Sequence, residues 1–248
     1  MPATPAWPPK SLPRLFVRAP LSDGASVELD PAQANYLGNV MRLGAGAELL
    51  VFDGQSGEWL AQVADAGKKR MTLSIKCRTR EEENIPDVWL AFAPVKRAQT
   101  DWLIEKATEL GAARLLPVMT QRTMAERVRL DRLEAIAIEA AEQCGRTRLP
   151  QINELVSLKL LLERRDPARA LYFADESGGE VAAAAFAQGA ALILIGPEGG
   201  FTDEERQLIR SAENAIPISL GPRILRAETA ALASLAAFMA IAGDWRAY

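Results

Sequence analysis

Ala191-Leu-Ile-Leu-Ile-Gly-Pro-Glu-Gly-Gly-Phe-Thr-Asp-Glu-Glu205 is the stretch that decides the fold of this 248-residue chain. Residues 191–195 form an unbroken apolar run, which predicts a strand buried on both faces of a parallel sheet. Three glycines and a proline at 196–200 end the strand, and Thr202 with Glu205 predicts a capping box at a helix start. This order points free backbone N–H groups into the crevice at the strand end, where α/β sheets bind ligands.

A second stretch repeats the same order about twenty residues later. Residues 216–220 predict another short strand, in which Pro217 favours an edge position or a strand start. A turn at 221–226 then leads into an Ala-rich helix at 227–241, which is too short to span a membrane. Two strands that each end in a glycine turn predict a small-molecule pocket lined by backbone.

The turn at 196–200 also fits a plain strand-to-helix connection, although such a connection needs one glycine and not three. A P-loop is excluded because Gly-Lys followed by Ser or Thr is missing, and a Rossmann fingerprint because G-x-G-x-x-G is missing. The chain has no histidine, which removes Ser-His-Asp and Cys-His catalysis and every histidine-based metal site. Its two cysteines, Cys77 and Cys144, form neither a disulfide framework nor a zinc pattern, so we expect no metal.

Composition predicts an ordinary globular protein located in the cytoplasm. Hydrophobic residues make up 49% and charged residues 25% of the chain, and no apolar run reaches the length of a membrane span. Residues 1–13 contain several prolines and no hydrophobic core segment, which predicts a flexible tail and not a signal peptide.

The net charge of −3 is unusual for a nucleic-acid binder, but the positive charges are clustered. Residues 68–80 carry six lysines and arginines in thirteen residues with no acid among them. A second run contains Arg114, Arg122, Arg127, Arg129 and Arg132 and continues to residue 148. Each run alone fits a solvated face, whereas two basic runs on an acidic chain favour phosphate contacts.

The order of predicted elements divides the chain into two kinds of fold. Short strands at 14–18, 48–54, 58–63 and 71–77, with one helix at 32–41, predict a small barrel. A charged stretch at 80–86 predicts a linker. Beyond it, strands at 88–93, 114–119 and 169–174 alternate with helices at 100–110, 130–144 and 181–188, which predicts a parallel α/β sheet.

Four motifs together resemble the RsmE family, the 16S rRNA (uracil-N3) methyltransferases of the SPOUT superfamily. They are GPEGGFTDEE from Gly196, LGPRILRAETA from Leu220, and the segments at 101–111 and 139–146, all in the family's order. The resemblance covers roughly residue 14 to the C-terminus, and the last two motifs along the chain are highly specific together. It implies a flexible tail at 1–13, a PUA-like RNA-binding β-barrel domain at 14–84, and a trefoil-knotted SPOUT methyltransferase domain at 85–248.

The resemblance also implies a function. The chain would transfer a methyl group from S-adenosyl-L-methionine to N3 of a uridine of 16S rRNA, uridine 1498 by resemblance, in the small ribosomal subunit. The implied cofactor-binding residues are Ile195, Gly196, Pro197, Glu198, Gly199, Gly200, Leu220, Gly221, Ile224, Leu225, Arg226 and Thr229. Alternatives are a SPOUT methyltransferase acting on another RNA, or an inactive RNA-binding factor of ribosome assembly. The intact GPEGG motif and Arg226 argue against the inactive factor.

The chemistry of uracil indicates which side chains to examine. The N3–H group is a weakly acidic imide, so methylation leaves negative charge to be stabilised on the ring oxygens. Arg226 is the first candidate for that role and Arg223 the second, because a guanidinium is always protonated. Glu198 is a candidate base or hydrogen-bond acceptor, although it fits a helix-capping carboxylate equally well. The candidate RNA-binding residues are Arg14, Arg42, Lys68, Lys69, Arg70, Lys96, Arg97 and Arg122.

One departure from the family pattern lies in the helix at 32–41. Family members usually have a histidine there, and this chain instead has Asn35-Tyr-Leu-Gly-Asn-Val-Met-Arg42, in which Arg42 still matches. The departure affects the RNA contacts expected of the N-terminal domain.

The helix at 227–241 is too apolar to face water, which predicts a homodimer. Its apolar residues lie on two neighbouring faces: Ala231, Leu235, Phe238 and Ala242 on one, and Leu232, Ala236 and Met239 on the other. A stripe this wide can pack on its own sheet and leave a patch for a partner. A helix wholly buried in one subunit explains the composition nearly as well, so the resemblance to dimeric SPOUT enzymes carries much of this prediction.

Overall fold

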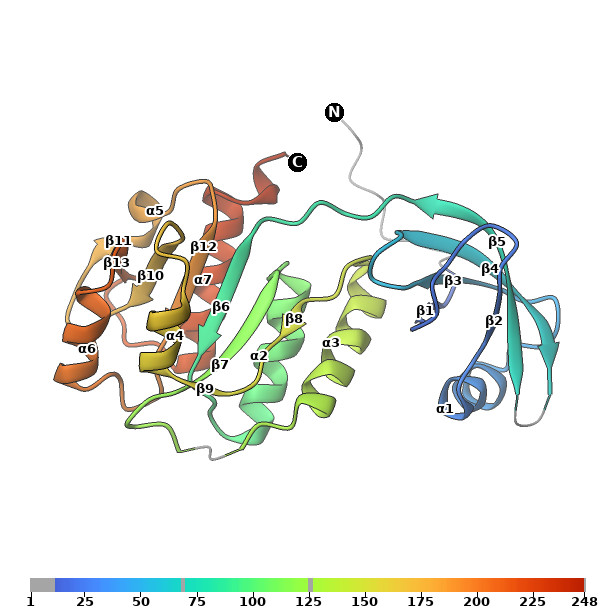
Figure 1. Ribbon diagram of the computed structural model, residues 1–248, viewed down its shortest axis with the longest axis horizontal. Helices are drawn as coiled ribbons and strands as arrows, with labels where there is room; N and C mark the ends of the chain where they lie inside the picture. Colours follow the sequence, from blue (N-terminus) through green and yellow to red (C-terminus); the bar gives the residue numbers. More distant parts are fainter. Residues whose placement is uncertain (1–11, 68–69, 125–126, 248) are drawn as a thin grey trace. The chain divides into compact units, whose positions relative to one another are not determined.

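The computed structural model describes residues 12–67, 70–124 and 127–247 (Figure 1). The chain separates into two compact units. The first runs up to Asn84 and also includes Ala141–Leu149, whereas the second contains Ile85–Ala140 and continues from Pro150. The domain ranges given above remain a proposal, and they do not include this return of residues 141–149 to the first unit.

The first unit is built on a five-stranded sheet with the order β1-β3-β4-β5-β2. Its strands are β1 (Arg14–Phe16), β2 (Ser26–Glu28), β3 (Glu48–Phe52), β4 (Glu58–Ala66) and β5 (Met71–Arg80). Alternate side chains of the strands point into one apolar core, in which Leu49, Val51 and Ala61 are fully buried. This mixed, mostly antiparallel sheet is the fold expected of the predicted N-terminal barrel.

The helix predicted at 32–41 is two shorter elements. Asp30 and Gln33 form a capping box, and Pro31 opens helix α1 (Pro31–Asn35). The chain then continues as a π-helix, Tyr36–Val40, which ends before Arg42 at a φ of 58°. π-Helical turns and left-handed non-glycine residues are both uncommon and gather at functional positions.

A buried ionic cluster joins this sheet to residues 141–146. Glu58 accepts hydrogen bonds from Arg14 at 2.7 Å and from Arg80 at 3.0 and 2.8 Å. Arg14 also donates to the carbonyl oxygens of Ala141, Glu142 and Arg146. The carbonyls of Ala141 and Glu142 lie in the last turn of helix α3 (Leu130–Cys144), so the guanidinium bonds the negative end of that helix.

The second unit is an α/β fold with a parallel sheet. Its strands follow the order β11-β13-β10-β12-β6-β7-β8, and β9 also pairs with β7. The strands are β6 (Val88–Phe92), β7 (Arg114–Met119), β8 (Gln151–Ile152), β9 (Val156–Ser157), β10 (Ala170–Ala174), β11 (Glu180–Val181), β12 (Ala191–Ile195) and β13 (Ala215–Ser219). The predicted strands at 114–119 and 191–195 are confirmed with the same bounds.

Helices cover both faces of this sheet, as alternate residues of β12 show. Ile193 and Ile195 pack with α2 (Arg97–Glu109), α3, α5 (Ala182–Ala185) and α7 (Ala227–Ile241). Leu192 and Leu194 point to the opposite face, where α4 (Leu158–Arg164) and α6 (Asp203–Arg210) pack. Burial on both faces explains why the strand carries no polar residue.

Three helices of this unit differ from the prediction. Helix α2 begins at Arg97 and not at residue 100. Helix α4 was not predicted, although Ser157 caps it and Leu158 and Leu161 bury its inner face. Helix α5 ends at Ala185 and not at 188, because Phe186 leaves the helix with extended backbone. Its ring packs edge-on against Tyr172 and Phe238 in the core.

The prediction that Pro217 occupies an edge strand or a strand start is wrong, because Pro217 lies in the middle of β13, the second strand from the sheet edge. The edge strand β11 pairs only with Ile218 and Ser219, so it leaves Pro217 without a ladder partner on that side.

Candidate functional site

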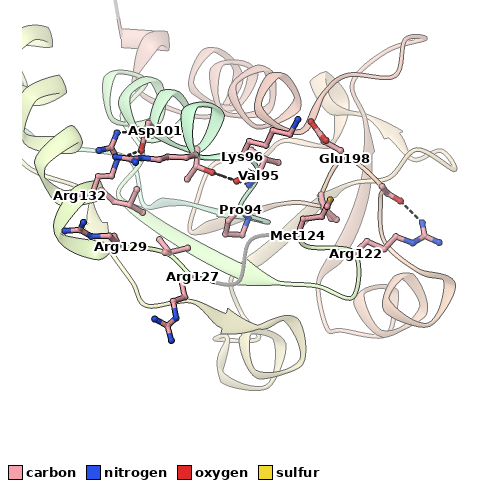
Figure 2. A pocket seen from close by; sticks show the side chains of 16 residues that line it. Pro94, Val95, Lys96, Asp101, Arg122, Met124, Arg127, Arg129, Arg132 and Glu198 are labelled. Carbon is pink, nitrogen blue, oxygen red and sulfur yellow. Dashed lines mark hydrogen bonds and ion pairs between the residues drawn. The ribbon is translucent and has the colours of Figure 1, made fainter.

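Two cavities lie at the carboxyl ends of the parallel strands in the second unit. We call the first the turn cavity, of about 580 Å³, which is lined mainly by 174–176, 178, 195–198, 200–201 and 218–227. We call the second the arginine cavity, of about 760 Å³, which is lined by 94–101, by residues between 122 and 133, and by 197–199 (Figure 2). Ligands bind at this edge of open α/β sheets, next to the point where the strand order reverses.

The turn cavity is formed by three loops that follow β10, β12 and β13. These strands are neighbours in the sheet, so their ends bring the three loops together. The loop after β12 begins helix α6 with the predicted capping box, in which Thr202 and Glu205 bond each other's backbone N–H groups. The predicted pocket lined by two glycine turns is therefore present as a cavity, with a third loop at Asp175.

Gly200 is the residue of the GPEGG turn whose backbone needs glycine. Its φ is 68°, and a Cβ atom there would lie 2.7 Å from Oε1 of Glu176. The preceding residue, Gly199, has no positive φ, and a Cβ atom there would meet only the flexible side chain of Arg122, at 3.3 Å. The turn is tight because Gly200 N–H donates to Pro197 O at 2.8 Å.

A buried carboxylate holds the loop after β10. Asp175 is 6% exposed and accepts a hydrogen bond from Arg210 of α6 at 2.6 Å, while Nε of Arg206 lies 3.1 Å away. Burial acts to raise the pKa of Asp175, but hydrogen bonds from Ser177 and Arg210 and the charge of Arg206 together lower it. Asp175 is therefore ionised near neutral pH and ties this loop to α6.

Two contacts tie the loop after β7 to α6 and to the glycine turn. Glu205 accepts a hydrogen bond from Gln121 N at 2.7 Å in addition to its capping bond. Arg122 donates to the carbonyl oxygen of Gly199 at 2.5 Å. The glycine turn is thus fixed from the arginine cavity as well as from α6.

The arginine cavity is strongly cationic. Six positively charged residues line it, namely Lys96, Arg97, Arg122, Arg127, Arg129 and Arg132, against two acids, Asp101 and Glu198. Figure 2 shows Arg127, Arg129 and Arg132 at one end of the cavity and Lys96, Glu198 and Arg122 toward the other. Asp101 accepts two hydrogen bonds from Arg132, at 2.9 and 2.5 Å, and these bonds lower the pKa of Asp101.

The structure brings most of the predicted cofactor residues to the turn cavity. Those that line it are Ile195, Gly196, Pro197, Glu198, Gly200, Leu220, Gly221, Ile224, Leu225 and Arg226. Gly199 lines the arginine cavity instead, and Thr229 lines neither cavity. Arg223 also lines the turn cavity, so all three predicted catalytic residues are at this site.

The predicted RNA-binding residues are divided between the two units. Lys96, Arg97 and Arg122 line the arginine cavity, together with Arg127, Arg129 and Arg132 of the second basic run. Arg42 and Arg70 are exposed in the first unit, and Arg70 lies 3.8 Å from Glu28. The Arg14 side chain is only 10% exposed and pairs with the buried Glu58. The positive charge of Arg14 therefore has a structural role in the first unit. Lys68 and Lys69 lie outside the described residues.

Several lining residues were not identified from the sequence. Gln99, Arg206 and Ser219 line the turn cavity, and Asp101 lines the arginine cavity. Lys96, which the sequence indicated as a candidate RNA-binding residue, lines both cavities. Lys96 reaches both cavities because β6 pairs with β12 in this register. A single sequence does not reveal which strands pair or in which register.

Two further searches covered the part of the chain that the structure describes. No helix there is long and apolar enough to cross a membrane. No group of three or more Cys, Asp or Glu side chains within those residues is arranged to hold a metal ion.

Comparisons with known proteins place the chain in a family. A profile described as an RNA methyltransferase domain matches residues 81–239, and one described as an RNA methyltransferase PUA domain matches residues 29–76. Ribosomal RNA small subunit methyltransferase E of Rickettsia conorii is 31% identical over 229 residues, which cover 90% of this chain and 93% of that protein. The Synechocystis protein of the same name is 35% identical over 88% of this chain and 74% of its own length.

Solved structures agree with these matches. Ribosomal RNA small subunit methyltransferase E from Neisseria gonorrhoeae, bound to S-adenosyl methionine, has a TM-score of 0.86 at 29% identity and covers 94% of this chain and 99% of its own. A methyltransferase from Legionella pneumophila, in complex with the same cofactor, has a TM-score of 0.87 at 29% identity over 95% of this chain and 100% of its own. The resemblance inferred from the four motifs is confirmed, and the chain belongs to the ribosomal RNA small subunit methyltransferase E family.

Proposed function

We propose that this chain uses S-adenosyl-L-methionine to methylate N3 of a uridine in 16S rRNA, uridine 1498 by family, within the small ribosomal subunit. It is an RNA methyltransferase, and relatives with its fold are solved with this cofactor. The observation that carries the proposal is the pair of adjoining cavities. One is lined by glycine turns and suits a small molecule, and the other is cationic and suits a nucleotide of RNA.

The residues of the turn cavity fit the chemistry of S-adenosyl-L-methionine. Ile195, Leu220 and Leu225 provide apolar walls for a flat base, and exposed backbone groups of the glycine turns provide polar partners for it. Arg226 and Arg223 carry positive charge that suits the carboxylate of the cofactor. When bound, the cofactor supplies a methyl group on a positively charged sulfur.

The cationic residues of the arginine cavity suit an RNA backbone. Arg97 and Arg127 have no ion-pair partner among the residues that the structure describes, so both are available to phosphates. Arg132 is paired with Asp101, so its contribution is smaller. The difference between the unpaired arginines and the paired Arg132 supports a site in which cations at one end of the cavity hold the phosphates. The target base then reaches toward Lys96 and Glu198 at the other end.

The reaction is tested by nucleoside mass spectrometry of 16S rRNA. We expect 3-methyluridine to disappear from a strain that lacks this chain and to return when the chain is supplied. Persistence of 3-methyluridine would contradict the uracil-N3 assignment. Loss of a ribose-methylated nucleoside or of a tRNA modification would instead point to another RNA target.

We also propose that the enzyme works as a homodimer in the cytoplasm, where ribosomal subunits are assembled. The two apolar faces of α7 differ in burial. Phe238 is 1% exposed and Leu235 is fully buried, so the face that holds them packs on its own sheet, and Phe238→Glu would disrupt the core instead of testing an interface. Leu232, Ala233 and Ala236 of α7 remain half-exposed, and Ile224 is 81% exposed, which supports a contact on that side.

Light scattering tests the dimer at micromolar concentration. We expect a species of twice the 26.9 kDa chain mass, and we expect Ala233→Glu to shift it toward the monomer because a charge would be buried at the interface. A wild-type species of 26.9 kDa would rule out the dimer. A dimer unaffected by Ala233→Glu would move the interface to another surface.

The first unit carries exposed arginines that we expect to contact RNA. Arg42 and Arg70 are exposed, and we expect the double variant Arg42→Ser/Arg70→Ser to bind small ribosomal subunits more weakly and with a shallower salt dependence, because fewer counterions are released. Affinity for S-adenosyl-L-methionine should stay at the wild-type value. Filter binding at several salt concentrations measures the effect, and an unchanged slope would show that these arginines do not contact phosphate.

A further inference from the structure

We propose that Lys96 and Glu198 are the residues that carry out the charge and proton chemistry at the uracil ring. Lys96 stabilises negative charge on a carbonyl oxygen beside N3, and Glu198 accepts the N3 proton. The inference rests on the proposed function, since it assumes that the turn cavity holds the cofactor and the arginine cavity the target nucleotide.

The position of the two residues follows from the sheet. Strands β6 and β12 are parallel neighbours, with Phe92 paired to Ile195, and Ala93 N–H donates to Ile195 O at 3.0 Å. Lys96 follows four residues after Phe92 and Glu198 three residues after Ile195, so both lie in the crevice above these two strand ends. Both therefore lie where the strand order reverses.

The two cavities meet at these residues. Only Lys96, Pro197 and Glu198 line both cavities among the residues described. A methyl donor in one cavity and a base in the other must bring their reacting atoms to about 3 Å of each other. Side chains at the shared wall are thus the ones able to touch the reacting atoms.

Lys96 is available for this role. No hydrogen bond or ion pair of its ammonium is found within the described part of the chain. Lys96 is the N-cap residue of α2, and no acid lies in the first turn of that helix. The helix N-terminus adds positive potential beside it. Arg122 and Arg132 are instead bonded to Gly199 O and Asp101, and Arg226 and Arg223 line the turn cavity alone.

Glu198 is the matching acceptor. Both Glu198 and Lys96 are exposed side chains, and Figure 2 shows them at the same end of the cavity. Glu198 does not cap α6, because Thr202 and Glu205 form that cap. The sequence left open that Glu198 caps this helix, but other residues fill that role.

The step balances as follows. The N3–H bond breaks and its proton passes to the Glu198 carboxylate. The electron pair left on N3 forms the bond to the methyl carbon, while the pair of the broken methyl–sulfur bond stays on sulfur. During this step, negative charge shared by N3 and the neighbouring carbonyl oxygens is met by the Lys96 ammonium. Glu198 later releases the proton to water.

The test compares Lys96→Met and Glu198→Gln with Lys159→Met, a matched change of an exposed lysine on helix α4 that lines neither cavity. Three quantities are measured: affinity for small ribosomal subunits without cofactor, calorimetric affinity for S-adenosyl-L-methionine, and single-turnover methylation at saturating concentrations. We expect Lys96→Met to lower the single-turnover rate about 100-fold or more, as loss of one charge-stabilising donor does. Both affinities should stay within about threefold of wild type, a change too small to be a lost phosphate contact.

The pH dependence separates the two roles. The deficit of Glu198→Gln should shrink as pH rises, because N3–H then ionises without a base, whereas the deficit of Lys96→Met should persist. Lys96→Arg should recover part of the rate, since the charge is kept.

Other outcomes would overturn the inference. A lower subunit affinity and a shallower salt slope in Lys96→Met, with a normal rate at saturation, would make Lys96 a phosphate contact. A deficit of Glu198→Gln that is constant with pH would remove Glu198 as the base. If wild-type enzyme and Lys159→Met transfer no methyl group to the subunit, the proposed function itself fails.

Discussion

Gly200→Val is expected to abolish measurable binding of S-adenosyl-L-methionine while the protein stays folded. A valine at a φ of 68° is strained, because its branched side chain clashes with the backbone in the left-handed region. Its Cβ atom would also lie 2.7 Å from Glu176 Oε1. Relieving either conflict moves the glycine turn that lines the turn cavity, so we expect affinity to fall about 100-fold or more, the size of effect that a misplacement of about 1 Å has on a reaction rate.

Calorimetry measures this effect, and two glycine variants serve as controls. Gly199→Val should have a milder effect, because the new side chain meets only the movable side chain of Arg122 and needs no positive φ. Gly44→Val lies in the first unit with nothing within 4 Å of its Cβ position, and its cofactor affinity should equal that of wild type. Wild-type affinity in Gly200→Val would show that the turn does not bind the cofactor.

Glu58→Gln is expected to destabilise the first unit by about 3–5 kcal/mol, the usual cost of breaking a buried ion pair by removing one partner. The Glu58 side chain is 6% exposed and is shared by Arg14 and Arg80. Its removal leaves the buried Arg14 charge uncompensated. Urea unfolding followed by tryptophan fluorescence reports the loss, because Trp59 lies in this unit and packs in its core.

The pH dependence of this difference has a definite sign. Burial acts to raise the pKa of Glu58, but hydrogen bonds from Arg80 and Arg14 and their charges leave the pKa below its ordinary value of 4.5. A lowered pKa stabilises the fold above the unfolded pKa, and this stabilisation is lost as pH falls through the native pKa. The difference between wild type and Glu58→Gln should therefore be constant near neutral pH and shrink below about pH 4.5.

The control for Glu58 is Glu28→Gln. Glu28 is 66% exposed and lies 3.8 Å from the exposed Arg70, so its loss should change stability by less than about 1 kcal/mol. Equal effects of the two variants would mean that the cluster around Glu58 adds nothing beyond a surface charge.

Local patterns predicted the methyltransferase fold well where they were strong. The run at 191–195 and the helices at 130–144 and 227–241 were predicted with the observed bounds, since their apolar patterns specify them locally. The π-helix after Asn35 was not predicted, because it differs from an α-helix only in which carbonyl each N–H group reaches.

The site was predicted in part for the same physical reason. Glycine turns identify the residues of one cavity, because they are contiguous in sequence. The shared wall between the cavities depends on which strands are neighbours, and β6 lies next to β12 although about one hundred residues separate them. Likewise, Arg14 is basic because it caps the end of α3, a partner that lies 127 residues away along the chain.

The return of Ala141–Leu149 to the first unit has a consequence for the order of events during synthesis. When Asn84 leaves the ribosome, Arg14 still lacks the carbonyl groups that it bonds in the finished protein. Those groups are made roughly 3 to 13 s later at the usual 5–20 residues per second, because residues 85–149 must be translated first. The N-terminal unit therefore cannot complete its folding until part of the catalytic unit has been synthesised.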